Sequence, residues 1–327
     1  MIDLFRKSTL MQVVLILVAT LLLWGRSLVH PPAMADGDAV LYHLLYMGLS
    51  SLPHLAVIMA MLLIIAEGVW LNLLLSNIGL VPQTTLLPTL LYIILMSAPA
   101  TTLTPMVLVG GIMIAITHQL MLRTMLLTIS TEKICSATAL IGLASMFYLP
   151  SLALILSYLL VVVNYRLYSL RDWMAMLLGL LAPYILLVTI LFLSDNLTIW
   201  WSGTYYSLSD ISLQSGTDKL LSMAGNIVII LVFLASLLML WSHIGEHPIV
   251  WQKNATTVML LSVGCAAMLL YTRIFPVDMR LFAVPFSLCG LHLLMTEKAY
   301  HSYGNRKKRT WIYDIILILT LVAAFIC

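Results

Sequence analysis

The sequence predicts an all-α fold, a polytopic transmembrane bundle of about eleven helical spans with roughly 20 residues in each. Hydrophobic residues make up 62% of the chain and charged residues only 9%, whereas an ordinary soluble domain has roughly 25% charged residues. Long apolar runs fill most of the 327 residues, and no polar stretch is long enough to form a second domain. We therefore expect a single integral membrane domain over residues 1–327.

The apolar runs place the expected spans in order along the chain. The first, near 8–28, follows a basic start as a signal sequence does, but its A-x-A string lies too far downstream for cleavage, so we expect a retained span. Residues 40–50 are too few to cross a membrane and are expected at its interface. The other spans are expected near 52–76, 84–100, 104–122, 134–148, 151–166, 173–194, 220–242, 255–272, 279–295 and 311–327.

Basic residues set the expected orientation, with the N-terminus inside and the C-terminus outside. This threading leaves only four of the chain's 16 Lys and Arg outside, namely Arg26, Lys219, Arg273 and Arg280. The other twelve lie inside, as the positive-inside rule requires. The run NRKKR at 305–309 is interpreted as an anchor on anionic lipid rather than as a nucleic-acid patch. These features predict a multi-pass membrane protein whose partner is membrane lipid and not nucleic acid.

Motifs of soluble enzymes are absent from the sequence. It contains no P-loop, no GxSxG, no HExxH and no dinucleotide fingerprint. The cysteines lie in or beside apolar segments without CxxC spacing, so we interpret them as packing residues and expect neither a metal site nor a cofactor. They are Cys135, Cys265, Cys289 and Cys327. Candidate site residues are therefore polar groups at membrane depth or on the outer face.

Glu67 interrupts the apolar run MLLIIAEGVWLNLLL at 61–75. If its span starts near Leu52, Glu67 lies about 22 Å along it at 1.5 Å per residue, just on the cytoplasmic side of the midplane. Hydrocarbon disfavours a carboxylate by several kcal/mol, so such a residue is a candidate functional group. The other interpretation, which we favour, is a protonated or hydrogen-bonded residue that faces the bundle interior and joins helices. His118, near the inner end of the 104–122 span, is a candidate partner.

Two acidic residues, Asp36 and Asp38, lie in the first outer loop, HPPAMADGDAVLYHLL. A carboxylate can act as a general base toward a hydroxyl group. The alternative is a solvated turn that caps the helix after it. Both interpretations stay open from the sequence.

A third polar group occurs in YTRIFPVDMRLFAVPF at 271–286, where Arg273 and Arg280 flank Asp278. Arginines on the outer side are exceptions to the positive-inside rule. A guanidinium group can bind a phosphate group through two hydrogen bonds. The group is therefore a candidate binding site for a phosphate-linked lipid. The alternative is an Arg–Asp–Arg salt bridge that snorkels to the headgroups.

Residues 118–187 carry a recognisable pattern: an LR…S…EK…A…IASLFYFPS block, an aliphatic span, then R…WR.W…G…PY. The matching residues are Arg123, Glu132, Lys133, Phe147, Tyr148, Pro150, Arg166, Arg171, Trp173, Gly179, Pro183 and Tyr184. With LFRKST and LLLSNIGLVPQTTLLPTLLY, this pattern resembles a family of uncharacterised multi-pass inner-membrane proteins of Bacteroidota. The segment FPVDMRLFAVPF loosely resembles polyprenyl-linked glycan transferases and polymerases. In the GT-C type of glycosyltransferase a catalytic Asp lies in the first outer loop, which implies that role for Asp36 or Asp38.

The leading hypothesis is a role in envelope glycan or lipid assembly, with a polyprenyl-phosphate-linked substrate handled at the outer leaflet. Asp36 or Asp38 would be the base, and Arg273 and Arg280 would bind phosphate. Two alternatives stay open: a proton-coupled transporter or flippase that uses Glu67, and a non-catalytic subunit that scaffolds an envelope complex with other inner-membrane proteins. A polar cavity on the outer side would favour the enzyme. A polar path to Glu67 would favour the transporter, and a closed bundle would favour the scaffold.

Overall fold

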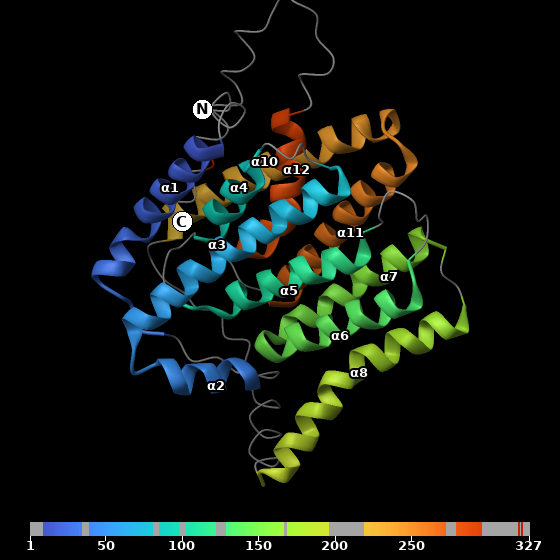
Figure 1. Cartoon of the computed structure of the whole chain (residues 1–327), viewed down its shortest axis with the longest axis horizontal. Coiled ribbons are helices and arrows are strands. Elements are labelled where there is room, and N and C mark those ends of the chain that lie inside the picture. Colours follow the sequence, from blue (N-terminus) through green and yellow to red (C-terminus); the bar gives the residue numbers. More distant parts are fainter. Residues whose placement is uncertain are drawn as a thin grey trace, which may run out of the picture.

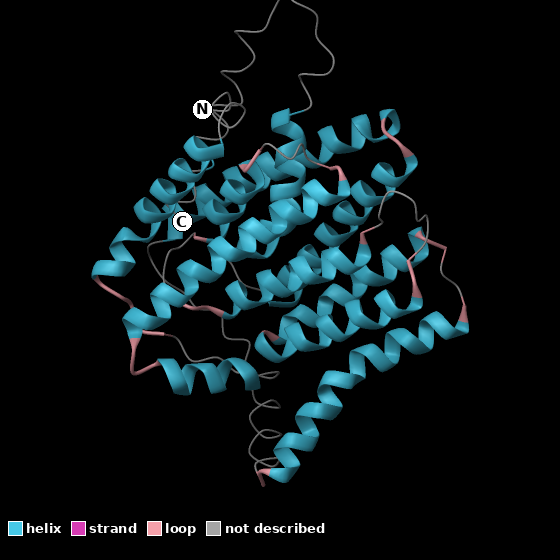
Figure 2. Cartoon of the chain, viewed as in Figure 1, coloured by secondary structure: helices cyan, strands magenta, loops and turns pink. Residues whose placement is uncertain are grey.

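The computed structural model describes residues 9–34, 39–80, 85–97, 102–121, 129–166, 169–195, 219–272 and 279–295, together with 320 and 322. Within these ranges the chain forms α-helices and short 3-10 segments and no β-strand (Figure 2), which confirms the all-α prediction. The α-helices are α1 (Thr9–Val29), α2 (Val40–Leu49), α3 (Pro53–Ile78), α4 (Leu87–Met96), α5 (Pro105–Leu120), α6 (Thr131–Phe147), α7 (Leu154–Asn164), α8 (Leu170–Leu193), α10 (Lys219–His243), α11 (Ile249–Thr272) and α12 (Ala283–Met295). The 3-10 segments are η2 (Leu149–Ala153), η3 (Ile244–Glu246) and η4 (Met279–Phe282).

Four helices in the described part of the chain are long and apolar enough to cross a membrane: Leu10–Val29, Pro53–Ile78, Leu170–Leu193 and Ile227–Glu246. By length and composition the chain is thus a helical membrane protein. Several expected spans are much shorter, since α4 has 10 residues, α7 has 11 and α12 has 13. At 1.5 Å per residue they measure about 15–20 Å, against a hydrocarbon thickness of about 30 Å. The count of about eleven spans remains a prediction.

The short helix α4 is the innermost element of the bundle. Every residue from Leu87 to Met96 is buried, and the helix packs against α1, α3 and α12 (Figure 1). A helix that is apolar on all sides has no face suited to water, so it is placed inside or in lipid. Its sequence, LPTLLYIILM, has that character, with Thr89 and Tyr92 as its polar side chains.

Helix boundaries follow the local sequence. Pro53, Pro88 and Pro105 lie in the first turns of α3, α4 and α5, where the missing amide hydrogen costs no bond. Gly79 ends α3 with a φ of 76°, a left-handed conformation that glycine adopts without strain. Pro183, in contrast, lies inside α8.

Hydrogen bonds between distant segments fix how the helix ends meet. The bonded pairs are Gln12 with the Leu86 amide, Trp24 with Ser97, Tyr42 with the Leu103 carbonyl, Thr131 with Asp172, and Tyr165 with Thr257. Each pair joins chain positions that the sequence places on the same side of the membrane. The bonds therefore agree with an alternating path of the chain, and they do not distinguish inside from outside.

Helix α2 lies at one end of the bundle (Figure 1), in the segment that is too short to span. Its Tyr42 is buried and donates to the carbonyl oxygen of Leu103 at 3.0 Å. His43 and Leu44, in contrast, are exposed. One side of α2 is thus held against the bundle, as expected for a helix at the interface.

Candidate functional site

The carboxyl group of Glu67 lies inside the bundle, on α3. Glu67 is only 5% exposed, and Ile64 and Leu71, one turn before and after it, are fully buried. The Tyr92 hydroxyl of α4 donates to Oε2 of Glu67 at 2.8 Å. The expectation that Glu67 faces the interior and is hydrogen-bonded therefore matches its position in the structure.

Three glycines bring the neighbouring helices close to this carboxyl group. A Cβ atom at Gly111 of α5 would clash with Oε1 of Glu67, and a Cβ atom at Gly110 would lie 2.5 Å from the Tyr92 hydroxyl oxygen. On α3, the Gly68 carbonyl accepts a bond from Thr89 Oγ1 of α4 at 3.0 Å. Helices α3, α4 and α5 thus meet around the carboxyl group, and a side chain at Gly110 or Gly111 would collide with Tyr92 or Glu67.

The groups that bond to Glu67 in the described residues are neutral. Besides Tyr92, the backbone of Gly111 is a hydrogen-bond partner of the carboxyl group. Neither partner carries a positive charge that would offset a carboxylate in an apolar interior. This setting suits a protonated carboxyl group, which can both donate and accept hydrogen bonds. The hydrogen bonds of Glu67 with Tyr92 and Gly111 join α3 to α4 and α5.

His118 does not share this point. It lies in the last turn of α5 and is exposed, and it follows Gly111 by about two helical turns, or roughly 10 Å. The sequence reasoning missed Tyr92 and the glycine pair as the true neighbours of Glu67. Their signals are a tyrosine within the apolar run LLYIILM and the adjacent glycines of VLVGGIM.

On the predicted outer side, Arg280 is the candidate residue that the structure describes. It belongs to η4 and is partly buried, and its Nη1 donates to Oγ1 of Thr104 at 3.1 Å. Thr104 is the N-cap residue of α5, and its side chain makes no capping bond to that helix. The guanidinium group therefore lies beside the amino-terminal end of a helix, which carries a partial positive charge.

The other outer candidates, Asp36, Asp38, Arg273 and Asp278, lie outside the described residues. The structure brings Arg280 next to Thr104. Thr104 is a further residue that sequence reasoning missed. Only the fold pairs it with a residue far along the chain.

Within the described ranges, no group of three or more His, Cys, Asp or Glu side chains is placed to hold a metal ion. Cys265 and Cys289 are buried and Cys135 is partly buried, all three as free thiols. No protein-family model matches the chain, and comparisons with curated proteins and with solved structures give no match either.

Proposed function

We propose that this protein binds a polyprenyl-phosphate-linked substrate at the outer leaflet of a bacterial inner membrane, in the assembly of envelope glycan or lipid. The observation that supports the proposal is the position of Arg280 beside the amino-terminal end of α5. A guanidinium group and a helix N-terminus both favour an anion, and phosphate matches the planar fork of arginine. An amphiphile with a phosphate head at this depth meets both requirements.

In this proposal Arg280 binds the phosphate group, with Arg273 and Asp278 completing the outer cluster. Asp36 or Asp38 is the general base that takes a proton from an acceptor hydroxyl. The N-terminus is inside, and the chain crosses the membrane about eleven times. That threading puts both Thr104 and Arg280 on the outer side, and the hydrogen bond between the two residues agrees with a shared side.

The packing around Glu67 gives less support to a proton-coupled transporter. Such a transporter needs a polar route to the carboxyl group, whereas Tyr92, Gly110 and Gly111 lie directly against it. We therefore assign Glu67 a structural role within the proposed function.

The proposal is tested by complementation of an envelope defect in a deletion strain. Arg280→Lys keeps the charge and loses the bidentate fork, so we expect a folded protein that accumulates normally and fails to complement. Arg26→Lys is the matched control, because it makes the same exchange at another arginine that the sequence places outside, in the last turn of α1. We expect it to complement. Full complementation by Arg280→Lys and by Asp38→Asn would overturn the proposed function and leave a scaffold or transporter as the better description.

A further inference from the structure

An apolar groove of about 380 Å³ lies between α10, α11 and the η4–α12 segment. It is lined by Ile229, Ile230, Phe233, Leu234, Leu237, Ser262, Val263, Ala266, Phe282 and Phe286. Ser262 is the polar residue of this lining, and its hydroxyl donates to the Met259 carbonyl. The volume of the groove falls within the range of roughly 300–1,000 Å³ that small-molecule sites occupy. The groove therefore offers shape and apolar contact and no polar group that requires a partner.

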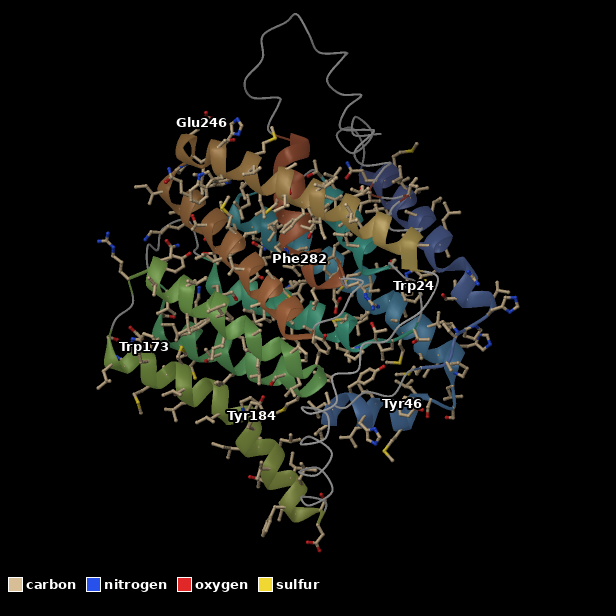
Figure 3. The ribbon with its side chains drawn as sticks, turned by 180° about the vertical axis from the view of Figure 1, so that it is seen from behind. Trp24, Tyr46, Trp173, Tyr184, Glu246 and Phe282 are labelled. Atoms are coloured by element: carbon tan, nitrogen blue, oxygen red, sulfur yellow. The ribbon has the colours of Figure 1, made fainter. Side chains whose placement is uncertain are left out.

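Aromatic rings form the inner wall of this groove. The Phe233 ring lies 5.2 Å from the Phe282 ring and 5.9 Å from the Phe286 ring, between centroids. Phe233 and Phe286 are buried, and Phe282, labelled near the middle of the view in Figure 3, is partly buried. Ring pairs at this separation stabilise one another beyond their buried area, so the wall is held in place without a ligand.

The groove borders an exposed apolar stripe of α10 at Leu234. That stripe consists of Ile227, Leu231, Leu234, Leu238 and Trp241, all exposed and spaced by three or four residues, so they share one helix face. Leu234 belongs both to the stripe and to the groove and is 49% exposed. In a membrane protein an apolar stripe of this kind faces hydrocarbon, so whatever fills the groove enters from the lipid.

We propose that this groove holds the isoprenoid tail of the phosphate-linked lipid, an inference that rests on the proposed function. Arg280 and Phe282 belong to the same short 3-10 segment, η4, two residues apart. The segment that carries one ring of the aromatic wall thus also carries the cation that reaches Thr104, which matches an amphiphile with an anionic head and an apolar tail. The flat alkene units of an isoprenoid chain pack against the ring faces of Phe233, Phe282 and Phe286.

The test fills the groove with a tryptophan side chain and measures how much lipid the protein retains. Ala266 lines the groove and is exposed, whereas Ala235, an exposed alanine of α10, is not among its lining residues. Ala266→Trp and Ala235→Trp are therefore a matched pair. Leu234→Trp and Leu238→Trp provide a second pair on the stripe, which keeps the test intact if one variant fails to fold.

The full-length protein is placed in phosphatidylglycerol–phosphatidylethanolamine nanodiscs with polyprenyl phosphate, with the same polyprenol lacking phosphate, or with no addition. Bound lipid is quantified by native mass spectrometry. We expect Ala266→Trp to retain about tenfold less polyprenyl phosphate than Ala235→Trp, because the indole takes up the apolar contact area of the tail. The polyprenol should also be lost in Ala266→Trp, and Arg280→Lys should weaken only the phosphate-bearing lipid.

Equal retention in the two variants would overturn the groove assignment. Loss of phosphatidylglycerol from Ala266→Trp with polyprenyl phosphate unchanged would overturn the identity of the tail, since the occupant would then be an acyl chain. Complementation separates this inference from the proposed function. If Ala266→Trp loses the lipid and both it and Arg280→Lys complement fully, the groove stands and the proposed function fails. If Arg280→Lys fails to complement and the groove variants bind polyprenyl phosphate normally, the proposed function stands and the groove assignment fails.

Discussion

At the scale of single residues, the buried carboxyl group of Glu67 is stabilised by the shape and hydrogen bonds around it rather than by an opposite charge. The Tyr92 hydroxyl donates to Oε2 at 2.8 Å, and the glycines of α5 leave the space that the carboxyl group occupies. Interhelical hydrogen bonds of this kind contribute on average about 0.6 kcal/mol and at most about 1.7 kcal/mol in membrane proteins. The larger effect is steric, because each of the three helices must present its backbone at this point.

Glu67→Gln should leave both stability and function nearly unchanged, because an amide keeps one donor and one acceptor at the same place. Tyr92→Phe should lower the free energy of unfolding by about 0.6–1.7 kcal/mol, since it removes one of the two hydrogen-bond partners of the buried carboxyl group. Thermal unfolding in detergent measures both changes. A Glu67→Gln protein that folds and accumulates normally yet does not complement would contradict the structural role and support proton coupling.

Gly111→Ala should be destabilising by about 1–3 kcal/mol, the usual cost of overpacking, because the new methyl group meets Oε1 of Glu67. Glu67→Ala in the same chain should relieve part of that cost. The double-mutant cycle should therefore show a coupling of about 1 kcal/mol or more between the two sites. Additive effects of the two substitutions would show that the carboxyl group does not lie against α5.

At the scale of the elements, α6 and α8 make the most extensive contact among the described helices. A Cβ atom at Gly142 of α6 would lie 2.7 Å from Pro183 Cγ and 2.8 Å from the Leu180 carbonyl oxygen. A Cβ atom at Gly179 of α8 would clash with Thr138 Oγ1 and with the Cys135 carbonyl. Small residues at facing positions are how membrane helices approach closely without help from the hydrophobic effect. Pro183, within α8, is therefore a contact residue of this pair.

Gly142→Ala and Gly179→Ala should each lower the thermal unfolding midpoint, with a loss of about 1–3 kcal/mol in the free energy of unfolding. Gly25→Ala is the matched control, because Gly25 also lies in a helix, α1, and a Cβ atom there meets nothing within 4 Å. There the helix propensity of alanine should leave stability unchanged or raise it by about 0.5–1 kcal/mol. Equal effects at all three positions would mean that the α6–α8 contact is looser than the structure has it.

At the scale of the whole molecule, the helices differ in how they relate to the membrane. The long helices α3 and α8 are apolar and partly exposed, whereas the 10-residue α4 is buried along its whole length. Short buried helices are tolerated in a bundle because neighbouring helices, not lipid, surround their ends. The half of α8 that follows Pro183 extends beyond the rest of the bundle (Figure 1) and exposes Ile185, Leu186 and Ile190.

The predicted threading is tested with single cysteines in a background in which the four native cysteines are replaced by alanine. A cysteine at Asn305 should be shielded from a membrane-impermeant thiol reagent in intact cells, because the basic residues around it favour the cytoplasm. A cysteine at Ser209 should be labelled. The opposite pattern would reverse the orientation, and labelling at both positions would contradict the span count.

How much the sequence predicts differs between the fold and the site. The helical class, the helix at 40–49 and the boundaries near Pro53 and Pro105 follow from composition and local chemistry, which act within a few residues. The interior position of Glu67 follows from the cost of a charge in hydrocarbon. Tyr92, Gly111 and Thr104 do not follow, because each becomes important only through a residue on another helix.

The sequence by itself determined that this protein is helical and made for a membrane, because an apolar chain with so few charges has no other stable environment. The tertiary structure alone decided which polar groups meet: Glu67 with Tyr92, and Arg280 with Thr104. It also decided that α4 is enclosed by other helices and that α10, α11 and α12 leave a groove. The physical reason is that apolar helices look alike in sequence, so their partners are chosen by the fit of small and large side chains across helices rather than by hydrophobicity.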